Sequence, residues 1–366
     1  MRFIIRLIKN LFTIKELKFL NSTKYNEIMK SIFIVFFIFV LLLNSTAQND
    51  NALLNVIPEW KNISLVSGEI PDSLPKILVI TNRPFEPANK DNIIFPNGIA
   101  QYRKVTYLEV AHNNGNWLVK VLGNFDEAMK ILDSSKDILL FVHGHGKTFN
   151  EILPRSMLIK NRYNVSLILF DWPAENSNFN KSLARVRRCS DNFYSLLLDL
   201  EKYRTNSMSE NQSLSVLAHS LGNYFLTHFV VNGCWQYIHT PFIDNIIFNA
   251  PAVRSKEHGE VISLITISKN KYVVLNKNDR VLRGANLLTS GKMLGNVVIE
   301  PFAGNTKYIN FTNIAGYLHT YFVGYNEFED ENQSVFNFYN SVIHGRQPNL
   351  SNDDFEKLNE NEYMIK

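Results

Sequence analysis

The sequence has few cysteines. Only Cys189 and Cys234 occur among 366 residues, whereas small secreted domains that depend on disulfides carry a dense cysteine framework. No CxxC pair is present to supply a thiolate metal site. Both cysteines fall in segments that we expect to be helical, and we favour two buried free thiols over a native disulfide.

Long hydrophobic segments are also scarce, with one exception near the start. From Met29 the sequence reads MKSIFIVFFIFVLLLNSTAQ, with one lysine, an apolar run and the small residues Ser45 and Ala47. This order predicts a secretory signal cleaved after Ala47, with Met29 as the start codon, and therefore a protein exported to the periplasm or beyond. The alternative is an uncleaved membrane anchor, but a spanning helix needs ~20 apolar residues and the run is shorter.

The chain lacks a strong excess of one charge. It has 38 basic and 34 acidic residues, a formal net charge of +4. Residues 1–47 hold seven of the basic and two of the acidic residues, so the mature part has a net charge of about −1. No basic footprint for nucleic acid remains. The one local cluster, Arg185, Arg187 and Arg188, we interpret as a solvated helix face.

Cofactor motifs are missing as well. There is no GxGxxG after an expected strand, no P-loop and no metal-ligand set, so we expect no cofactor. His143 and His145, two positions apart, could face one metal ion, but no third ligand occurs at a suitable spacing. We expect no stable membrane span after removal of the leader, and the oligomeric state stays open.

Apolar residues, by contrast, are plentiful. They make up 45% of the chain, and aromatic residues 12%, enough for a large core. From about residue 75, expected strands alternate with helices. The strands are 76–83, 117–121, 137–144, 164–173, 214–218, 245–251, 271–279 and 306–311. The helices are 125–132, 150–162, 180–204, the segment after Ser220, and 257–267.

This alternation predicts an α/β fold with a mostly parallel sheet and helices on both faces, because the strands are apolar on both sides. We expect a leader over 1–47, an N-terminal extension over 48–74 and one domain over 75–350. The polar residues 351–366 are expected to form a frayed tail.

Chemically useful side chains follow the expected strands. Ligands of such sheets bind beyond the carboxyl ends of the strands. His143 ends one strand, Ser220 follows another, Asp279 ends a third and His319 comes later. The order Ser220, Asp279, His319 is the chain order of the α/β-hydrolase triad. A serine hydroxyl needs an adjacent base, which His319 would supply, and Asp279 would orient that ring.

The stretch SVLAHSLGNYF has the pattern of a nucleophile elbow. An apolar strand runs into a helix at Ser220, and the sharp turn needs small residues two positions on either side. Gly222 meets this need, and Ala218 stands where glycine is usual. The backbone amides of Leu221 and His145 are the expected oxyanion donors.

Glycines flank the second expected donor. Gly144 and Gly146 would let the backbone of this loop approach a substrate closely.

Other residues compete for these roles. Asp244 and Glu257 are alternatives for the acid, and Asp279 could simply cap the next helix. His344 and His258 are alternatives for the base. We interpret His219 as a packing residue and Asn223 as a hydrogen-bonding residue near the helix start. The polar segment 173–183 is a candidate lid.

Together these segments resemble a known family. ILLFVHGHGKTF, LILFDWPAE, LSVLAHSLGNYFL, IIFNAPAV, VVLNKNDRVL and LHTYF, in this order, are similar to the bacterial α/β-hydrolase family of unknown function DUF900. The similarity spans about residues 76–345, and VITNRPF resembles the family's opening strand with its T-x-R element. Relatives often have Tyr-Asn at His145 and Gly146, and methionine at Leu221.

The resemblance implies a Ser220 nucleophile, an acid at Asp279 and a base at His319. It says little about the substrate. We expect an exported serine hydrolase of ester or related acyl bonds, acting on a small or lipid-like substrate. Carboxylesterase or lipase activity is the first expectation, while amidase, peptidase and thioesterase chemistry use the same machinery. The rival is a non-catalytic binding module on the same scaffold.

Overall fold

The computed structural model describes residues 62–87, 93–96, 98–100, 104–174, 179–238, 240–289, 291–323 and 332–366. The predicted leader over 1–47 lies outside the described residues, as does the extension up to residue 61. The chain separates into two compact units, Met1–Asn51 and Ala52–Lys366. All described residues belong to the second unit, and the fold below is the fold of that unit.

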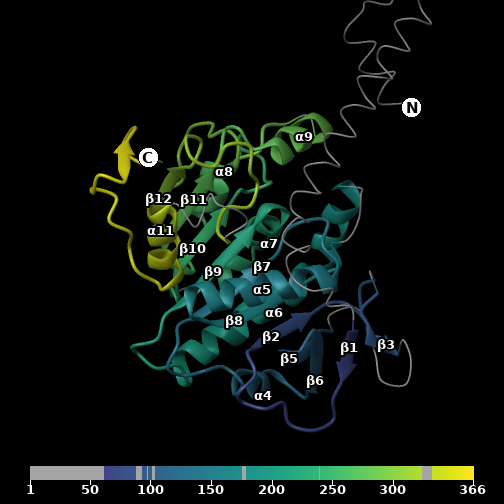
Figure 1. The fold of residues 1–366 in the computed structure, drawn as a ribbon. Helices are drawn as coiled ribbons and strands as arrows, with labels where there is room; N and C mark the ends of the chain where they lie inside the picture. Colours follow the sequence, from purple (N-terminus) through teal and green to yellow (C-terminus); the bar gives the residue numbers. More distant parts are fainter. Residues whose placement is uncertain are drawn as a thin grey trace, which may run out of the picture. The chain divides into compact units, whose positions relative to one another are not determined.

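A 12-stranded sheet, counted over the described residues, forms its centre (Figure 1). In spatial order the strands are β1 (Asn62–Leu65), β6 (Asn116–Leu122), β5 (Thr106–Asn113), β2 (Lys76–Thr81), β8 (Ser166–Asp171), β7 (Ile138–Val142), β9 (Leu214–His219), β10 (Ile243–Asn249), β11 (Ser268–Leu275), β12 (Thr306–Asn310), β14 (Glu362–Ile365) and β13 (Phe355–Lys357). From β2 to β14 in this order, each strand is parallel to the next one, whereas β5 is antiparallel to β2 and β13 is antiparallel to β14.

Helices connect most of these strands. They are α4 (Phe125–Met129), α5 (Phe149–Tyr163), α6 (Phe179–Asn206), α7 (Asn223–Val231), α8 (His258–Ser263), α9 (Arg280–Thr289) and α11 (Gln333–Ile343). Two short 3₁₀ helices, η1 (Ser220–Gly222) and η2 (Cys234–Tyr237), flank α7. Strands β3 (Glu86–Pro87) and β4 (Ile93–Ile94) pair separately. The mostly parallel α/β architecture confirms the predicted fold class.

The strand register places helices on both faces of the sheet. Leu139 of β7 pairs with Ser215 of β9, whose hydroxyl donates to a carbonyl in α11. Val142 of β7 pairs with Phe170 of β8, whose ring packs edge-on against Phe193 of α6. Positions 139 and 142 of one strand point to opposite faces, because side chains alternate along a strand. Helices α11 and α6 therefore cover opposite faces.

The central strands form the core. Every residue of β7, β8, β9 and β10 is buried, which explains why these strands appear in the sequence as continuous apolar runs rather than as alternating ones. Polar side chains in them occur mainly near the strand ends. Function is therefore expected at the edges of the sheet, where the strands stop.

One hairpin was missed in the sequence. The prediction began a strand at residue 117 and left 106–113 unassigned, but β5 and β6 form an antiparallel pair joined by Asn114 and Gly115. Both turn residues have positive φ, 47° and 83°. Asn-Gly between two strands is a strong hairpin signal, because both central residues of such a turn need φ above zero. The sequence therefore does contain a local signal for this hairpin.

The expectation of a frayed C-terminal tail is wrong. Strand β14 pairs in parallel with β12, and β13 pairs antiparallel with β14, so the last residues extend the sheet. Ile365 and Phe355 are buried, although the residues between 356 and 362 are mostly polar. β13 is the edge strand and β14 lies next to it, and strands near an edge expose more of their surface, so the sequence of this segment is mostly polar. The domain extends beyond 350 at this end, and β1 extends it before residue 75 at the other.

Two expectations about composition can also be compared with the structure. Cys189 and Cys234 are both free thiols; Cys189 is buried as predicted, whereas Cys234 is half-buried. Burial raises the pKa of Cys189 to about 12, which leaves it unreactive. Within the described residues, no helix is long and apolar enough to cross a membrane.

Candidate active site

The candidate site begins where β9 ends. Ser220 follows the last residue of that strand, His219, and opens η1, which continues into α7. Its φ is +52°, a left-handed conformation that is uncommon for a residue other than glycine. Such strain persists only where the surrounding structure enforces it. The backbone at Ser220 thus has the conformation expected of a nucleophile elbow.

Neighbouring backbone explains why small residues surround Ser220. A Cβ at Gly222 would lie 2.6 Å from the carbonyl oxygens of Val142 and His143, so the end of β7 passes where a side chain would be. A Cβ at Gly144 would lie 2.9 Å from the Cβ of Ser220. The loop after β7 is therefore packed directly against the elbow. Both glycines are steric requirements of this contact.

The two expected oxyanion donors come from these segments. Leu221 lies in the first turn of η1, where backbone amides have no acceptor within the helix. The amide of His145 donates to no described residue. Gly146, at φ +76°, turns the loop and donates its amide to the carbonyl of Ala174 at 2.9 Å. Loop and elbow together present backbone amides at the carboxyl edge of the sheet.

Asp279 and His319 meet at the same edge. The Nδ1 of His319 donates to the Oδ2 of Asp279 at 2.6 Å. The other oxygen, Oδ1, accepts from the amide of Leu282 at 3.0 Å. Asp279 therefore caps α9 and also bonds an imidazole, so its use as a helix cap does not conflict with the predicted role as the acid. With the proton of a neutral ring held on Nδ1, Nε2 is the nitrogen able to act as a base.

The imidazole of His319 lies close to the elbow. Its ring centroid is 4.7 Å from that of His219, the residue before Ser220. Asp279 is fully buried, whereas His319 and Ser220 are 8% and 6% exposed. The carboxylate is thus shielded, while the hydroxyl and the imidazole retain some access. Residues that are 59 and 99 positions from Ser220 along the chain end at the same corner of the sheet.

His219 has a supporting role, as the sequence suggested. The hydroxyl of Tyr339 donates to Oδ1 of Asn249, so the amide nitrogen of Asn249 faces Nδ1 of His219, at 3.1 Å. The ring proton then resides on Nε2, 3.3 Å from the Oγ1 of Thr320. Burial, and to a lesser degree the charge of His319, holds the pKa of His219 well below its ordinary value. A neutral, fully bonded His219 fixes the segment that carries His319.

The competing acids lie elsewhere. Asp244 accepts from the amide of Leu214, the first residue of β9, and from Lys269 at 2.7 Å. This is the amino edge of the sheet, opposite Ser220. Glu257 is exposed and precedes α8.

The competing histidines also have structural partners. His344 bonds to Asp137, and His258 bonds to the hydroxyl of Tyr308 at 2.8 Å. Asn223 bonds to the carbonyl of Ser220 at 2.9 Å, near the helix start as predicted. Only Asp279 and His319, among these candidates, are brought to the elbow.

A buried ion pair beside the loop was not anticipated. Arg83 and Asp171 are both fully buried and bonded through Nε at 3.0 Å and 3.1 Å. Burial alone would raise the pKa of Asp171, but the charge of Arg83 and hydrogen bonds from His143 and Thr81 outweigh it and lower the pKa. The carboxylate is therefore charged at neutral pH.

The same arginine holds the loop in place. Its Nη2 donates to the carbonyls of Lys147 and Trp172, at 3.0 Å and 2.9 Å. Arg83 thus ties the end of the loop after β7 to the end of β8. The element TNR, with Thr81 and Arg83 both bonded to Asp171, was noticed in the sequence only as a likeness. Two features of the sequence could have indicated this ion pair. Arg83 comes just after one apolar strand, and Asp171 ends another.

Two further expectations concern absent or undescribed features. The candidate lid over 173–183 lies partly outside the described residues, which omit 175–178. In the described part of the chain, no group of three or more His, Cys, Asp or Glu side chains could hold a metal ion.

The side chain of His145 has a structural partner of its own. It bonds to the hydroxyl of Ser182 at 2.8 Å, and burial lowers the pKa of His145 to about 4.

Sheet, elbow and Asp–His pair define an α/β hydrolase. The family described as "Alpha/beta hydrolase of unknown function (DUF900)" matches residues 123–336, more than half of the chain. The chain belongs to this family, which confirms the resemblance seen in the sequence. The match includes the elbow, Asp279 and His319. No curated protein matches the chain.

Several solved esterases are similar to the chain. An esterase from Pyrobaculum calidifontis has 10% identity and a TM-score of 0.40, and the alignment covers 82% of this chain and 92% of that one. An esterase structure from Rhizomucor miehei has 11% identity and a TM-score of 0.38, covering 82% and 88%. Carboxyl esterase 2 from Tuber melanosporum has 8% identity and a TM-score of 0.38, covering 82% and 96%. Likenesses this distant carry no argument about substrate.

Proposed function

We propose that this α/β hydrolase is a serine hydrolase that cleaves an ester or related acyl bond through an acyl-serine intermediate. The observation that carries the proposal is the strained backbone of Ser220, at φ +52°, beside a loop that approaches within steric contact. The Asp279–His319 hydrogen bond at the same edge supports it. A strained serine conformation is costly and is found mainly at functional sites.

The chemistry follows from these groups. Ser220 Oγ attacks the carbonyl carbon while Nε2 of His319 accepts its proton, and Asp279 stabilises the imidazolium that forms. The amides of His145 and Leu221 would bind the oxyanion; one such donor is worth roughly 3 kcal/mol of barrier. The intermediate collapses, and the leaving alcohol takes the proton from His319. Water then attacks the acyl carbon while it gives a proton to His319. The acyl–serine bond breaks, the acid leaves, and His319 returns the proton to Ser220 Oγ.

A serine-reactive fluorophosphonate probe tests the proposal. We expect labelling of the wild-type protein at Ser220 and none of Ser220→Ala. His319→Gln should label far more slowly, because the base is missing. Circular dichroism would show that each variant is folded. A folded wild-type protein that resists the probe, or a Ser220→Ala variant that labels equally, would favour the non-catalytic module.

The nature of the acyl bond is a finer question. A panel of aryl esters of increasing acyl length, with matched anilides and thioesters, would separate esterase, amidase and thioesterase activity. We expect esters to react faster than anilides, since an aryloxide leaving group needs less assistance from the acid form of His319 than an anilide nitrogen does.

Export remains a separate proposal. It depends on the segment from Met29 to Ala47, with its lysine, apolar run and small residues before the cleavage point. Expression of the full chain with a C-terminal tag should give a mature protein beginning at Gln48 in the extracytoplasmic fraction. An intact N-terminus that stays in the membrane would instead indicate an uncleaved anchor.

A further inference from the structure

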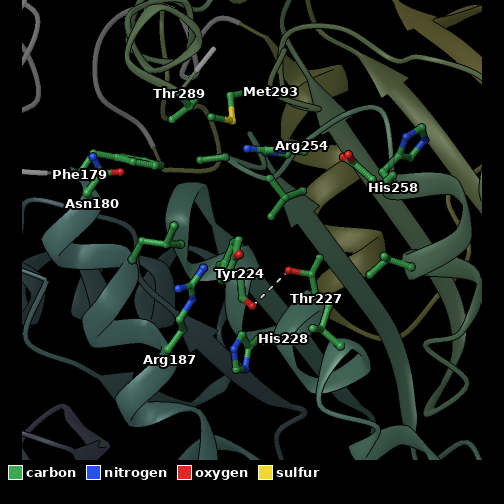
Figure 2. Close-up of a pocket in the computed structure, with 16 residues that line it drawn as sticks. Phe179, Asn180, Arg187, Tyr224, Thr227, His228, Arg254, His258, Thr289 and Met293 are labelled. Atoms are coloured by element: carbon green, nitrogen blue, oxygen red, sulfur yellow. Dashed lines mark hydrogen bonds between the residues drawn. The ribbon is translucent and has the colours of Figure 1, made fainter. Parts of the chain in front are cut away.

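A cavity lies next to the elbow. Its volume is about 510 Å³, within the usual size of small-molecule sites. It opens to solvent and is lined by the start of α6, by α7 and by the segment from the end of β10 into α8, with Thr289 of α9 and Met293 at one end (Figure 2). Apolar lining comes from Leu183, Val253 and Val261 among others. Neither Ser220 nor His319 lines the cavity.

Three contacts connect the cavity to the catalytic groups. Ala252, in its wall, donates its amide to the carbonyl of Ser220 at 3.1 Å. Tyr224, also in the wall, lies one helical turn after Ser220. Phe179, at the cavity's edge, places its ring 6.2 Å from the ring of His145 on the oxyanion loop. A substrate bonded at Ser220 could therefore extend into this cavity.

Two arginines line the cavity, Arg187 from α6 and Arg254 from the segment after β10. Figure 2 shows them on either side of Tyr224 in that view. Neither guanidinium forms an ion pair or a hydrogen bond with any described residue, in contrast to Arg185, which donates to the carbonyl of Pro173. Arg187 is exposed on α6, as expected of a solvated helix face, and it also lines this cavity.

The other charged or titratable groups leave the cavity positive. Glu257 also lines it, but pairs with neither arginine among the described ion pairs. Burial lowers the pKa of His228 and of His258, and the charge of Arg187 lowers the first further. Both rings are therefore uncharged at neutral pH. Two guanidinium groups against one carboxylate leave an excess of positive charge.

We propose that the cavity binds an anionic group of the substrate, a carboxylate or a phosphate, placed by Arg187 and Arg254. Guanidinium groups match the planar or tetrahedral oxygens of such anions with paired N–H donors. The apolar wall would hold the chain between the anionic group and the scissile bond. The proposal rests on the serine-hydrolase function and assigns to it a substrate class: esters that carry a negative charge.

Matched pairs of esters test this substrate class. The first pair is p-nitrophenyl butyrate and the mono-p-nitrophenyl ester of glutaric acid, which adds a carboxylate on the acyl side. The second pair is glycerol monobutyrate and its glycerol phosphate counterpart, which adds a phosphate on the alcohol side. We expect a higher kcat/KM for the charged member of at least one pair. The two pairs distinguish carboxylate from phosphate.

Variants assign any preference to the cavity. Arg187→Gln and Arg254→Gln should each lower the charged-to-neutral ratio of kcat/KM roughly tenfold or more, since each removes hydrogen bonds from a charged donor to the anion. Arg188→Gln is the matched control, because Arg188 adjoins Arg187 on α6 but lies outside the cavity lining. Its ratio should equal that of the wild type. A preference that is absent, or that is equally affected by Arg188→Gln, overturns the proposal.

A binding measurement separates this proposal from the hydrolase proposal. Calorimetry on Ser220→Ala should detect the charged ester of the preferred pair binding more tightly than the neutral one, and Arg187→Gln in that background should abolish the difference. Without ester cleavage or fluorophosphonate labelling, the hydrolase proposal fails even if arginine-dependent binding persists. Ester cleavage without a preference for the charged substrate would support the hydrolase proposal and contradict the proposal of an anion-binding cavity.

Discussion

Two Asp–His pairs in this protein have the same bond but lie in different places. In each, a histidine Nδ1 is 2.6 Å from an aspartate Oδ2: Asp279–His319 and Asp137–His344. The first pair lies at the carboxyl edge of the sheet, beyond β11 and β12. The second lies at the amino edge, where Asp137 precedes β7 and His344 follows α11. Geometry of the pair alone therefore does not identify a catalytic site.

The second ring nitrogen marks the difference. Nε2 of His344 is 2.9 Å from the carbonyl oxygen of Tyr163, so both of its nitrogens face oxygen acceptors and neither can accept a proton from a nucleophile. His319 instead lies against His219, next to the strained Ser220. The pair at the amino edge joins α11 to the start of β7 and to α5. The pair at the carboxyl edge adjoins the serine that we propose as the nucleophile.

The largest expected effect is the contrast in activity between the two histidines. His319→Gln should lower kcat/KM by about 10⁴-fold or more, as the loss of a triad member does. His344→Gln should leave kcat/KM within a few-fold of the wild type and lower only stability. Ester hydrolysis and thermal unfolding of both variants would decide. Equal losses of activity would mean that the two pairs do not differ in function.

A third Asp–His contact sharpens the comparison. His143 Nε2 lies 3.2 Å from Asp171 inside the fully buried Arg83 network. Arg83→Met leaves a buried carboxylate without its cation and should lower the free energy of unfolding by about 3–5 kcal/mol. The double variant Arg83→Met/Asp171→Asn should recover part of that loss. Urea unfolding measures both, and strictly additive losses would contradict a paired role.

The contribution of the Asp137–His344 pair to stability should depend on pH. Removing the carboxylate with Asp137→Asn should cost about 1.5–3 kcal/mol at pH 7, the value of a charge-assisted hydrogen bond. Burial opposes ionisation, but hydrogen bonds from His344 and Ser213 outweigh it and lower the pKa of Asp137 below 3.8. The native state therefore keeps Asp137 charged to lower pH than the unfolded state does.

The contribution of Asp137 is then present above about pH 3.8 and is lost as the pH falls through the lower native pKa. Unfolding free energies of the wild type and Asp137→Asn should converge in strong acid. A gap that is constant from pH 7 to pH 2 would show that the ionised carboxylate is not responsible. Asp353→Asn, at an exposed acid in the turn before β13, serves as the control.

The smallest expected effect concerns His145 beside the elbow. Its pKa is lowered by burial from 6.5 to about 4, so between these values the unfolded state binds a proton that the native state does not. Stability should fall as the pH drops, by roughly 1 kcal/mol between pH 6.5 and pH 5.5. His145→Gln should show a shallower decline. An unchanged slope would mean that other buried histidines account for it.

The sequence allowed much of the sheet to be predicted because its central strands are unambiguous. Residues on both faces of the central strands are buried, in β7, β8, β9 and β10. A strand in a parallel sheet that is covered by helices on both sides needs apolar residues on both of its faces. β5 and β14 lie near the two ends of the sheet and were missed because only part of each strand is fully buried, which dilutes the apolar signal. For β5 an Asn-Gly turn was an available second signal. For β14 no comparable signal exists, since its pairing with β12 is wholly tertiary.

The elbow was predictable from local sequence, and the cavity was not. Ser220 and Gly222 lie within three residues, and their steric demands are local. Arg187 and Arg254 are 67 positions apart. Neither local sequence indicates that the two side chains line one cavity. The arginines on α6 look alike in sequence, although Arg187 lines the cavity and Arg188 does not.

By itself the sequence determined the α/β class, the position of the strained serine and the chain order of Ser220, Asp279 and His319. These follow from hydrophobic periodicity and from small residues at fixed offsets, both of which are local properties. Only the tertiary structure decided which Asp–His pair adjoins the serine and which one ties α11 to the amino edge. The reason is physical: parallel strands bring residues far apart in the chain to one edge, and the order of strands in the sheet decides which residues meet there.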